Sequence, residues 1–139
     1  MKAILIIISI FILGITTVNG QNFIGMSQSK IINKFGQPDE KGSNFFIYYD
    51  QTEEGINTYY FDSSNNCDAF VITRTTKYLI DYQKLINKDF TKTPENFYVS
   101  TSKNKNFKAE ITQTAGEFQI RITTIGATLV PMEKNIASF

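Results

Sequence analysis

Residues 25–39 read GMSQSKIINKFGQPD and carry the signals of one short helix with both ends marked. Ser27 is a typical N-cap, because its hydroxyl can accept a hydrogen bond from an amide of the first turn. Met26 and Ile31 have the spacing of a hydrophobic staple. Gly36 favours the backbone conformation that ends many helices, and a proline follows two residues later.

The apolar residues of this predicted helix lie on one face. They are Ile31, Ile32 and Phe35, whereas Lys30 and Lys34 point away from them. A helix of about ten residues is not stable in water unless it packs against something. We therefore expect Phe35 to be buried against the strands that follow.

Residues 44–50, 56–62 and 67–74 are rich in aromatic and β-branched side chains, and they predict a three-stranded antiparallel meander. A symmetric loop over residues 51–55 would pair Asp50 with Ile56. The face that we assign to the core then consists of Phe45, Ile47, Tyr49, Tyr59, Phe61, Phe70 and Ile72. The other face consists of Phe46, Tyr48, Thr58, Tyr60, Cys67, Ala69 and Val71. A slip of one residue would exchange the two faces.

The second half repeats this order of elements. Residues 76–89 have helical spacing, and residues 96–101, 105–113 and 117–125 read as strands. We predict an α+β fold of two helix-strand-strand-strand units, 25–74 and 76–125, with an antiparallel sheet and the helices on one face. Residues 126–139 form a predicted C-terminal arm.

The stretch Gly25-Met26-Ser27, a short helix and then Phe35-Gly36-Gln37-Pro38 before aromatic strands resembles the SmpA/OmlA (BamE-like) family of small outer-membrane lipoproteins. The resemblance implies the architecture that this family shares with β-lactamase-inhibitor proteins. Those lipoproteins begin with a lipidated cysteine after the leader, and this chain has none there. Membrane anchoring is therefore not implied.

Residues 1–20 have the pattern of a secretory signal peptide. Lys2 precedes an apolar run from Ala3 to Leu13, which at about eleven residues is short for a membrane span of about 20. An uncleaved anchor is the alternative. We expect cleavage after Gly20, export to the periplasm or the outside of the cell, and a single domain over residues 21–139.

The composition excludes several classes of function. Removing Lys2 leaves 13 basic and 13 acidic side chains without a basic stripe, so we expect no nucleic-acid partner. Without histidine, the Ser-His-Asp and Cys-His arrangements are absent. The single cysteine, Cys67, allows no internal disulfide and is either a buried apolar residue or a free thiol. We expect no cofactor and no metal site.

Carboxylates are the remaining catalytic option. Glu53 and Glu54 occupy a predicted loop, where a solvated turn is the simpler interpretation. Asp50, Asp62 and Asp68 stand at predicted strand ends, and we place them near one edge of the meander. Such residues can bind a hard cation, but they more commonly cap turns.

Aromatic residues are the unusual feature of the chain, with 12 Phe and 7 Tyr but no Trp. Tyrosine on an open sheet face suits protein interfaces. We therefore predict a binding surface at Phe46, Tyr48, Thr58 and Tyr60, on a non-catalytic module that binds another envelope or secreted protein as an assembly factor or inhibitor. Dimerisation through this surface is one alternative. A small secreted enzyme that uses carboxylates, or a small-ligand or sugar binder that uses tyrosines, are the others.

Overall fold

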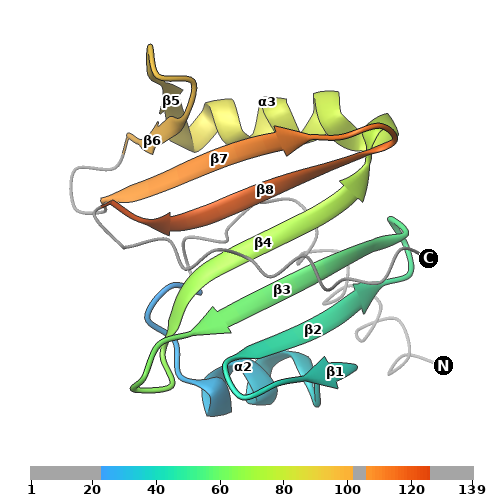
Figure 1. Cartoon of the computed structure of the whole chain (residues 1–139), viewed down its shortest axis with the longest axis vertical. Coiled ribbons are helices and arrows are strands. Elements are labelled where there is room, and N and C mark those ends of the chain that lie inside the picture. Colours follow the sequence, from blue (N-terminus) through green and yellow to red (C-terminus); the bar gives the residue numbers. More distant parts are fainter. Residues whose placement is uncertain (1–22, 102–105, 126–139) are drawn as a thin grey trace, which may run out of the picture.

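An antiparallel β-sheet of eight strands runs through the part of the chain that the computed structural model describes, residues 23–101 and 106–125 (Figure 1). The strands are β1 (Glu40–Lys41), β2 (Phe45–Asp50), β3 (Gly55–Phe61), β4 (Cys67–Thr75), β5 (Phe90–Lys92), β6 (Tyr98–Ser100), β7 (Phe107–Gln113) and β8 (Glu117–Thr124). Helix α2 (Gln28–Phe35) precedes β1, and the 3-10 turn η2 (Thr76–Tyr78) and helix α3 (Leu79–Asp89) follow β4. The predicted leader and the predicted arm at 126–139 lie outside the described residues.

The strands are arranged in the order β1-β2-β3-β4-β8-β7-β6-β5. The first half of the chain therefore forms one side of the sheet and the second half the other, and they join where β4 pairs with β8. The predicted α+β class and the antiparallel sheet are confirmed. The short strands β1 and β5 were not predicted, so each helix is followed by four strands rather than three.

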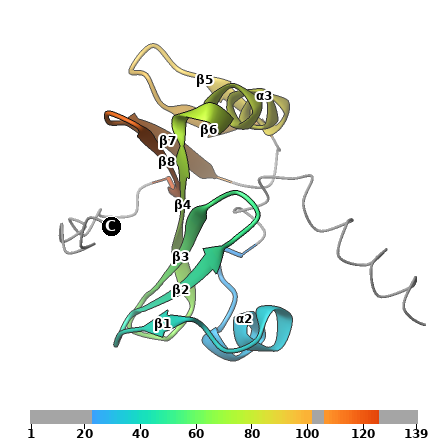
Figure 2. The same cartoon turned by 90° about the vertical axis from the view of Figure 1, so that its right-hand side faces the viewer.

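Both helices lie on the same side of the sheet (Figure 2). Ile31 of α2 and Ile86 of α3 are fully buried, and they belong to one apolar cluster with inward-facing strand residues. Among these strand residues, Phe118, Ile120 and Ile122 of β8 are buried and alternate with the more exposed Gln119 and Arg121. We call the opposite side of the sheet the helix-free face.

The signals at the ends of α2 are confirmed. The Lys30 amide donates to Ser27 Oγ at 3.3 Å, and Gly36 has a positive φ of 84° while its amide donates to the Ile32 carbonyl. Phe35, however, is 42% exposed, so the prediction that it is buried is wrong. Phe35 is the last residue of α2, and its ring packs beside those of Tyr48 and Tyr59 at the rim of the core.

The predicted register between β2 and β3 is wrong by one residue. Asp50 pairs with Gly55 rather than Ile56, so Phe46 and Tyr48 face the helices while Phe45 and Ile47 lie on the helix-free face. The predicted pairing of Tyr59 with Phe70 is confirmed.

A register shift between Tyr60 and Phe61 then pairs Phe61 with Cys67. It places Cys67 in the core, 2% exposed, and not on the opposite face as predicted. Of the two interpretations of this cysteine, the structure therefore supports the buried apolar residue.

Candidate functional site

The four residues of the predicted binding surface do not share a face. Phe46 is buried under the helices, and Tyr48 is half-buried there with its hydroxyl donating to the Gly36 carbonyl at 2.9 Å. Thr58 and Tyr60 lie on the opposite side of the sheet. Thr58 pairs with Ile47 and Tyr60 with Phe45, so both face away from the helices, on the helix-free face. Thr58 is only 3% exposed and Tyr60 is half-buried. The prediction of one continuous surface is wrong because the register of β2 differs.

The most concentrated polar site in the described residues surrounds Arg74, near the end of β4. Its side chain is 3% exposed, and it lies on the helix side of the sheet because it shares the face of β4 with Phe70 and Ile72, which precede it by four and two residues. All five guanidinium N–H groups donate to acceptors: Nε to Glu53 Oε2 (2.7 Å), Nη1 to the carbonyls of Thr73 (2.9 Å) and Ile56 (3.1 Å), and Nη2 to Asp50 Oδ2 (3.0 Å) and Asn57 Oδ1 (3.0 Å). Arg74 therefore has no N–H group left to bind an external anion.

This network connects separate elements. The Tyr82 hydroxyl of α3 donates to Glu53 Oε2, the same oxygen that accepts from Arg74. The Arg74 guanidinium also lies 5.8 Å from the centre of the Tyr82 ring. The loop between β2 and β3, strand β4 and helix α3 are thus held together around one buried cation.

Gly55 leaves the space that this arrangement needs. A Cβ at residue 55 would lie 2.4 Å from Arg74 Cδ and 2.6 Å from the Thr73 carbonyl oxygen. The Arg74 side chain therefore crosses directly over the first residue of β3. This close approach accounts for a glycine at the first position of β3, a residue that the sequence analysis had placed in the loop instead.

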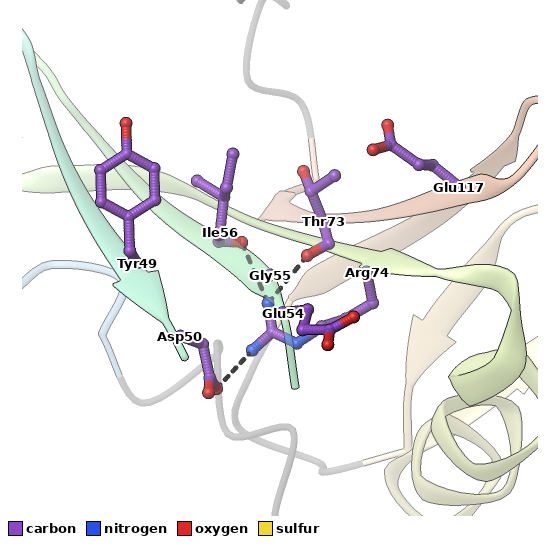
Figure 3. Close-up of a pocket in the computed structure, with 8 residues that line it drawn as sticks. All are labelled: Tyr49, Asp50, Glu54, Gly55, Ile56, Thr73, Arg74 and Glu117. Atoms are coloured by element: carbon purple, nitrogen blue, oxygen red, sulfur yellow. Dashed lines mark hydrogen bonds and ion pairs between the residues drawn. The ribbon is translucent and has the colours of Figure 1, made fainter. Parts of the chain in front are cut away.

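A hollow of about 540 Å³ adjoins this network at the same end of the sheet (Figure 3). Its lining residues are Tyr49, Asp50, Glu54, Gly55, Ile56, Thr73, Arg74 and Glu117. Figure 3 shows the side chains of Tyr49, Ile56, Thr73 and Glu117 on one side of the strands and those of Arg74 and Asp50 on the other. The hollow therefore opens beside the helix-free face, and the Arg74 network closes its base.

The buried thiol and phenol groups are protonated near neutral pH, because burial raises their pKa values. Burial raises the pKa of the Cys67 thiol to about 12, and the Asp68 carboxylate adds to the effect. Burial also raises the pKa of Tyr82, with a further contribution from its hydrogen bond to Glu53. Burial raises the pKa of Tyr59 as well. These side chains serve the core rather than supplying an activated anion.

The three aspartates singled out in the sequence do not gather at one edge. Asp50 and Asp62 lie at opposite ends of the β2–β3 hairpin, because Asp50 pairs with Gly55 while Asp62 follows the last residue of β3. Each caps a turn: Asp50 Oδ1 accepts from the Thr52 and Glu53 amides, and Asp62 Oδ1 from those of Ser64 and Asn66. No cluster of three or more potential metal-ligating side chains occurs within residues 23–101 and 106–125.

Sequence reasoning missed Arg74 and the role of Glu53. The available signal was the position of Arg74 in β4, two and four residues after the inward-facing Ile72 and Phe70. A charged residue at an inward position requires a partner of opposite charge. The acidic residues at 50, 53 and 54 were the natural candidates, although only the fold brings Asp50 and Glu53 within 3.0 Å and 2.7 Å of it.

Comparisons with known proteins leave the family open. No family model matches the chain, and no curated protein matches it. Among solved structures, the chain is similar to the crystal structure of a DUF4309 family protein (YjgB) from Bacillus subtilis subsp. subtilis strain 168. The identity is 11%, the match covers 70% of this chain and 78% of that one, and the TM-score is 0.43. Within the described ranges, no helix has both the length and the apolar character needed to cross a membrane.

Proposed function

We propose that this chain is an exported, non-catalytic module that binds another protein of the envelope or the extracellular space. The observation that carries the proposal is the rim of the hollow, where the Tyr49 side chain is 39% exposed next to Ile56 and Glu117. Tyrosine supplies a large contact area at a small cost in conformational entropy, which suits protein interfaces.

The polar groups behind this rim support a binding role over a catalytic one. Asp50 and Glu53 are engaged by Arg74, and Glu53 also accepts from Tyr82. A carboxylate that acts as a general acid or base has to reach the proton that it transfers. The carboxylate enzyme therefore ranks below the binding module, and the roles of assembly factor and inhibitor both fit the same surface.

Export is part of this proposal and rests on residues 1–20, with Gln21 as the N-terminus of the mature chain and no lipid attached. The intact mass of the protein purified from its source tests this part. The two-unit organisation is a further part. It is supported by the order of strands, in which β1–β4 and β8–β5 mirror each other across the β4–β8 pair.

A second candidate is a small-ligand binder. The volume of the hollow, about 540 Å³, falls within the roughly 300–1,000 Å³ of ligand pockets. Native mass spectrometry of the protein purified from its source distinguishes this candidate, because a retained small molecule adds a discrete mass.

The test of the protein-binding function is affinity capture followed by reconstitution. The tagged chain is expressed in its source cells and cross-linked, and the captured protein is then purified and titrated. We expect saturable binding that weakens with Tyr49→Ser. The control is Ile80→Ser, since Ile80 is 65% exposed on α3 and does not line the hollow. Absence of a saturable protein partner would contradict the proposed function. If Tyr49→Ser binds the partner as tightly as wild type, the binding surface does not include the rim of the hollow.

A further inference from the structure

The wall of the hollow that faces away from Arg74 is built from one row across three strands. Tyr49 of β2 pairs with Ile56 of β3, and Ile56 pairs with Thr73 of β4. Glu117, the first residue of β8, pairs with Thr75, which follows Thr73 on the same side of β4. The row thus runs from an aromatic ring through an aliphatic side chain to a hydroxyl, with a carboxylate beside it (Figure 3).

The charge around the hollow is negative. Among the described residues that surround it, four carboxylates face two cations: Asp50, Glu53, Glu54 and Glu117 against Arg74 and Lys77. Arg74 is shared between Asp50 and Glu53. Lys77 approaches Glu54 only to 3.8 Å, with both side chains more than half exposed, so this pair contributes little. The Glu117 carboxylate forms no ion pair within the described ranges.

Thr73 adds a hydroxyl group to the wall of the hollow. The residue is only 8% exposed, and its side chain points into the hollow (Figure 3). A hydroxyl can donate and accept hydrogen bonds, so Thr73 can bind a polar group that enters the hollow.

An anion does not suit the hollow, because every N–H group of Arg74 is already used and the remaining charges are negative. A hard metal ion would need more oxygen ligands in one place than the described residues bring together. A lysine or arginine side chain matches all three features. Its aliphatic stem can pack on Tyr49 and Ile56, while its cationic tip reaches Glu117 and donates to Thr73.

We propose that the hollow lined by Tyr49, Thr73 and Glu117 receives one lysine or arginine side chain of the partner protein. This inference rests on the proposed function, since it names the chemical class of the group that the partner inserts. It assigns separate roles to the lining residues: Tyr49 and Ile56 hold the stem, Glu117 supplies the charge, and Thr73 accepts a hydrogen bond from the tip.

The test is an NMR titration of the isotopically labelled chain with short capped peptides. The probes are acetyl-Gly-Arg-Gly-amide and acetyl-Gly-Lys-Gly-amide, with acetyl-Gly-Glu-Gly-amide as the charge control. We expect the arginine or lysine peptide to shift the amide signals of Gly55, Ile56, Thr73 and Glu117, with a dissociation constant on the order of 10 mM. The glutamate peptide should not shift them.

Two variants with the same change in charge make the titration specific. Glu117→Lys should abolish the shifts, while Glu95→Lys should preserve them, because Glu95 is exposed in the loop between β5 and β6 at the other end of the sheet. Equal shifts with the glutamate peptide, equal loss in both variants, or no shifts at about 50 mM peptide would overturn the inference.

The purified partner separates this inference from the proposed function. If Glu117→Lys still binds the partner as tightly as the wild-type chain, the inference about the hollow fails and the protein-binding function stands. If no protein partner exists, the proposed function fails whatever the peptides do.

Discussion

Arg74 is buried among apolar residues, and its charge is tolerated because each of its N–H groups has an acceptor. Two of these acceptors, Asp50 and Glu53, are carboxylates at 27% and 22% side-chain exposure. Removing the cation would leave both in a partly desolvated setting without their partner. At the scale of single residues, this network is therefore the most sensitive polar feature.

We expect Arg74→Met to lower the free energy of unfolding by about 3–5 kcal/mol, the range for breaking a buried ion pair from one side. Chemical denaturation measures this change. The matched control is Lys77→Met, which removes an exposed ion pair with Glu54 and a contact with the Tyr78 ring, and which should stay within about 0.5 kcal/mol of wild type. A loss below about 1 kcal/mol for Arg74→Met would show that the carboxylates do not depend on the cation.

Cys67 gives a pH-dependent prediction. The folded protein holds its thiol protonated up to a pKa of about 12, whereas an unfolded thiol loses its proton near the ordinary value of 9.0. Between these values the unfolded state binds fewer protons, so stability falls as pH rises.

We expect Cys67→Ala to be less stable than wild type but to have a shallower pH slope in this window, by up to about 1.4 kcal/mol per pH unit. Denaturation curves recorded at several pH values from about 8 to 11 compare the two slopes, because the unfolded thiol titrates near 9.0 and the folded thiol near a pKa of about 12. Identical slopes would mean that Cys67 titrates as an ordinary exposed thiol.

At the scale of elements, local patterns predicted most of the structure. The caps of α2 follow from Ser27 and Gly36, and the alternation in β8 follows from the period of its apolar residues. The predicted register of β2 was wrong because it assigned Gly55 to the loop. Gly55 belongs to β3, where the Arg74 side chain, 19 residues further along the chain, crosses directly over it. The hollow was not predicted for the same reason, since Tyr49 lies on the helix-free face only in the observed register.

Helix α2 shows how position within an element sets the cost of a substitution. Ile31 is fully buried, so Ile31→Ala should lower the free energy of unfolding by about 2–5 kcal/mol. Phe35 is 42% exposed, so Phe35→Ala should cost less than the roughly 3–5 kcal/mol of a buried phenylalanine, about 2 kcal/mol. Urea denaturation of both variants tests the order, and a greater loss for Phe35→Ala than for Ile31→Ala would contradict it.

At the scale of the whole molecule, the two halves share the long pairing of β4 with β8, from Ala69–Thr123 to Thr75–Glu117. The apolar cluster is also continuous from α2 to α3. We therefore expect a single cooperative unfolding transition, with the same midpoint by tyrosine fluorescence and far-ultraviolet circular dichroism. Separate midpoints would mean that the halves are independent folding units.

Under our proposal, the groups that hold the fold are separate from those that a partner would contact. The Arg74 network lies on the helix side and connects three elements, whereas Tyr49, Thr73 and Glu117 line the hollow on the other side. A substitution at the exposed Glu117 should therefore leave the fold intact while it changes what the hollow can bind.

The most direct test of this separation is the affinity of Glu117→Lys for the purified partner, measured on a sample whose unfolding curve is recorded in parallel. Our account predicts a free energy of unfolding within about 0.5 kcal/mol of wild type and an affinity at least about tenfold weaker, because a like charge then occupies the place of the incoming cation. A variant that is folded as wild type and binds the partner with unchanged affinity would contradict the account.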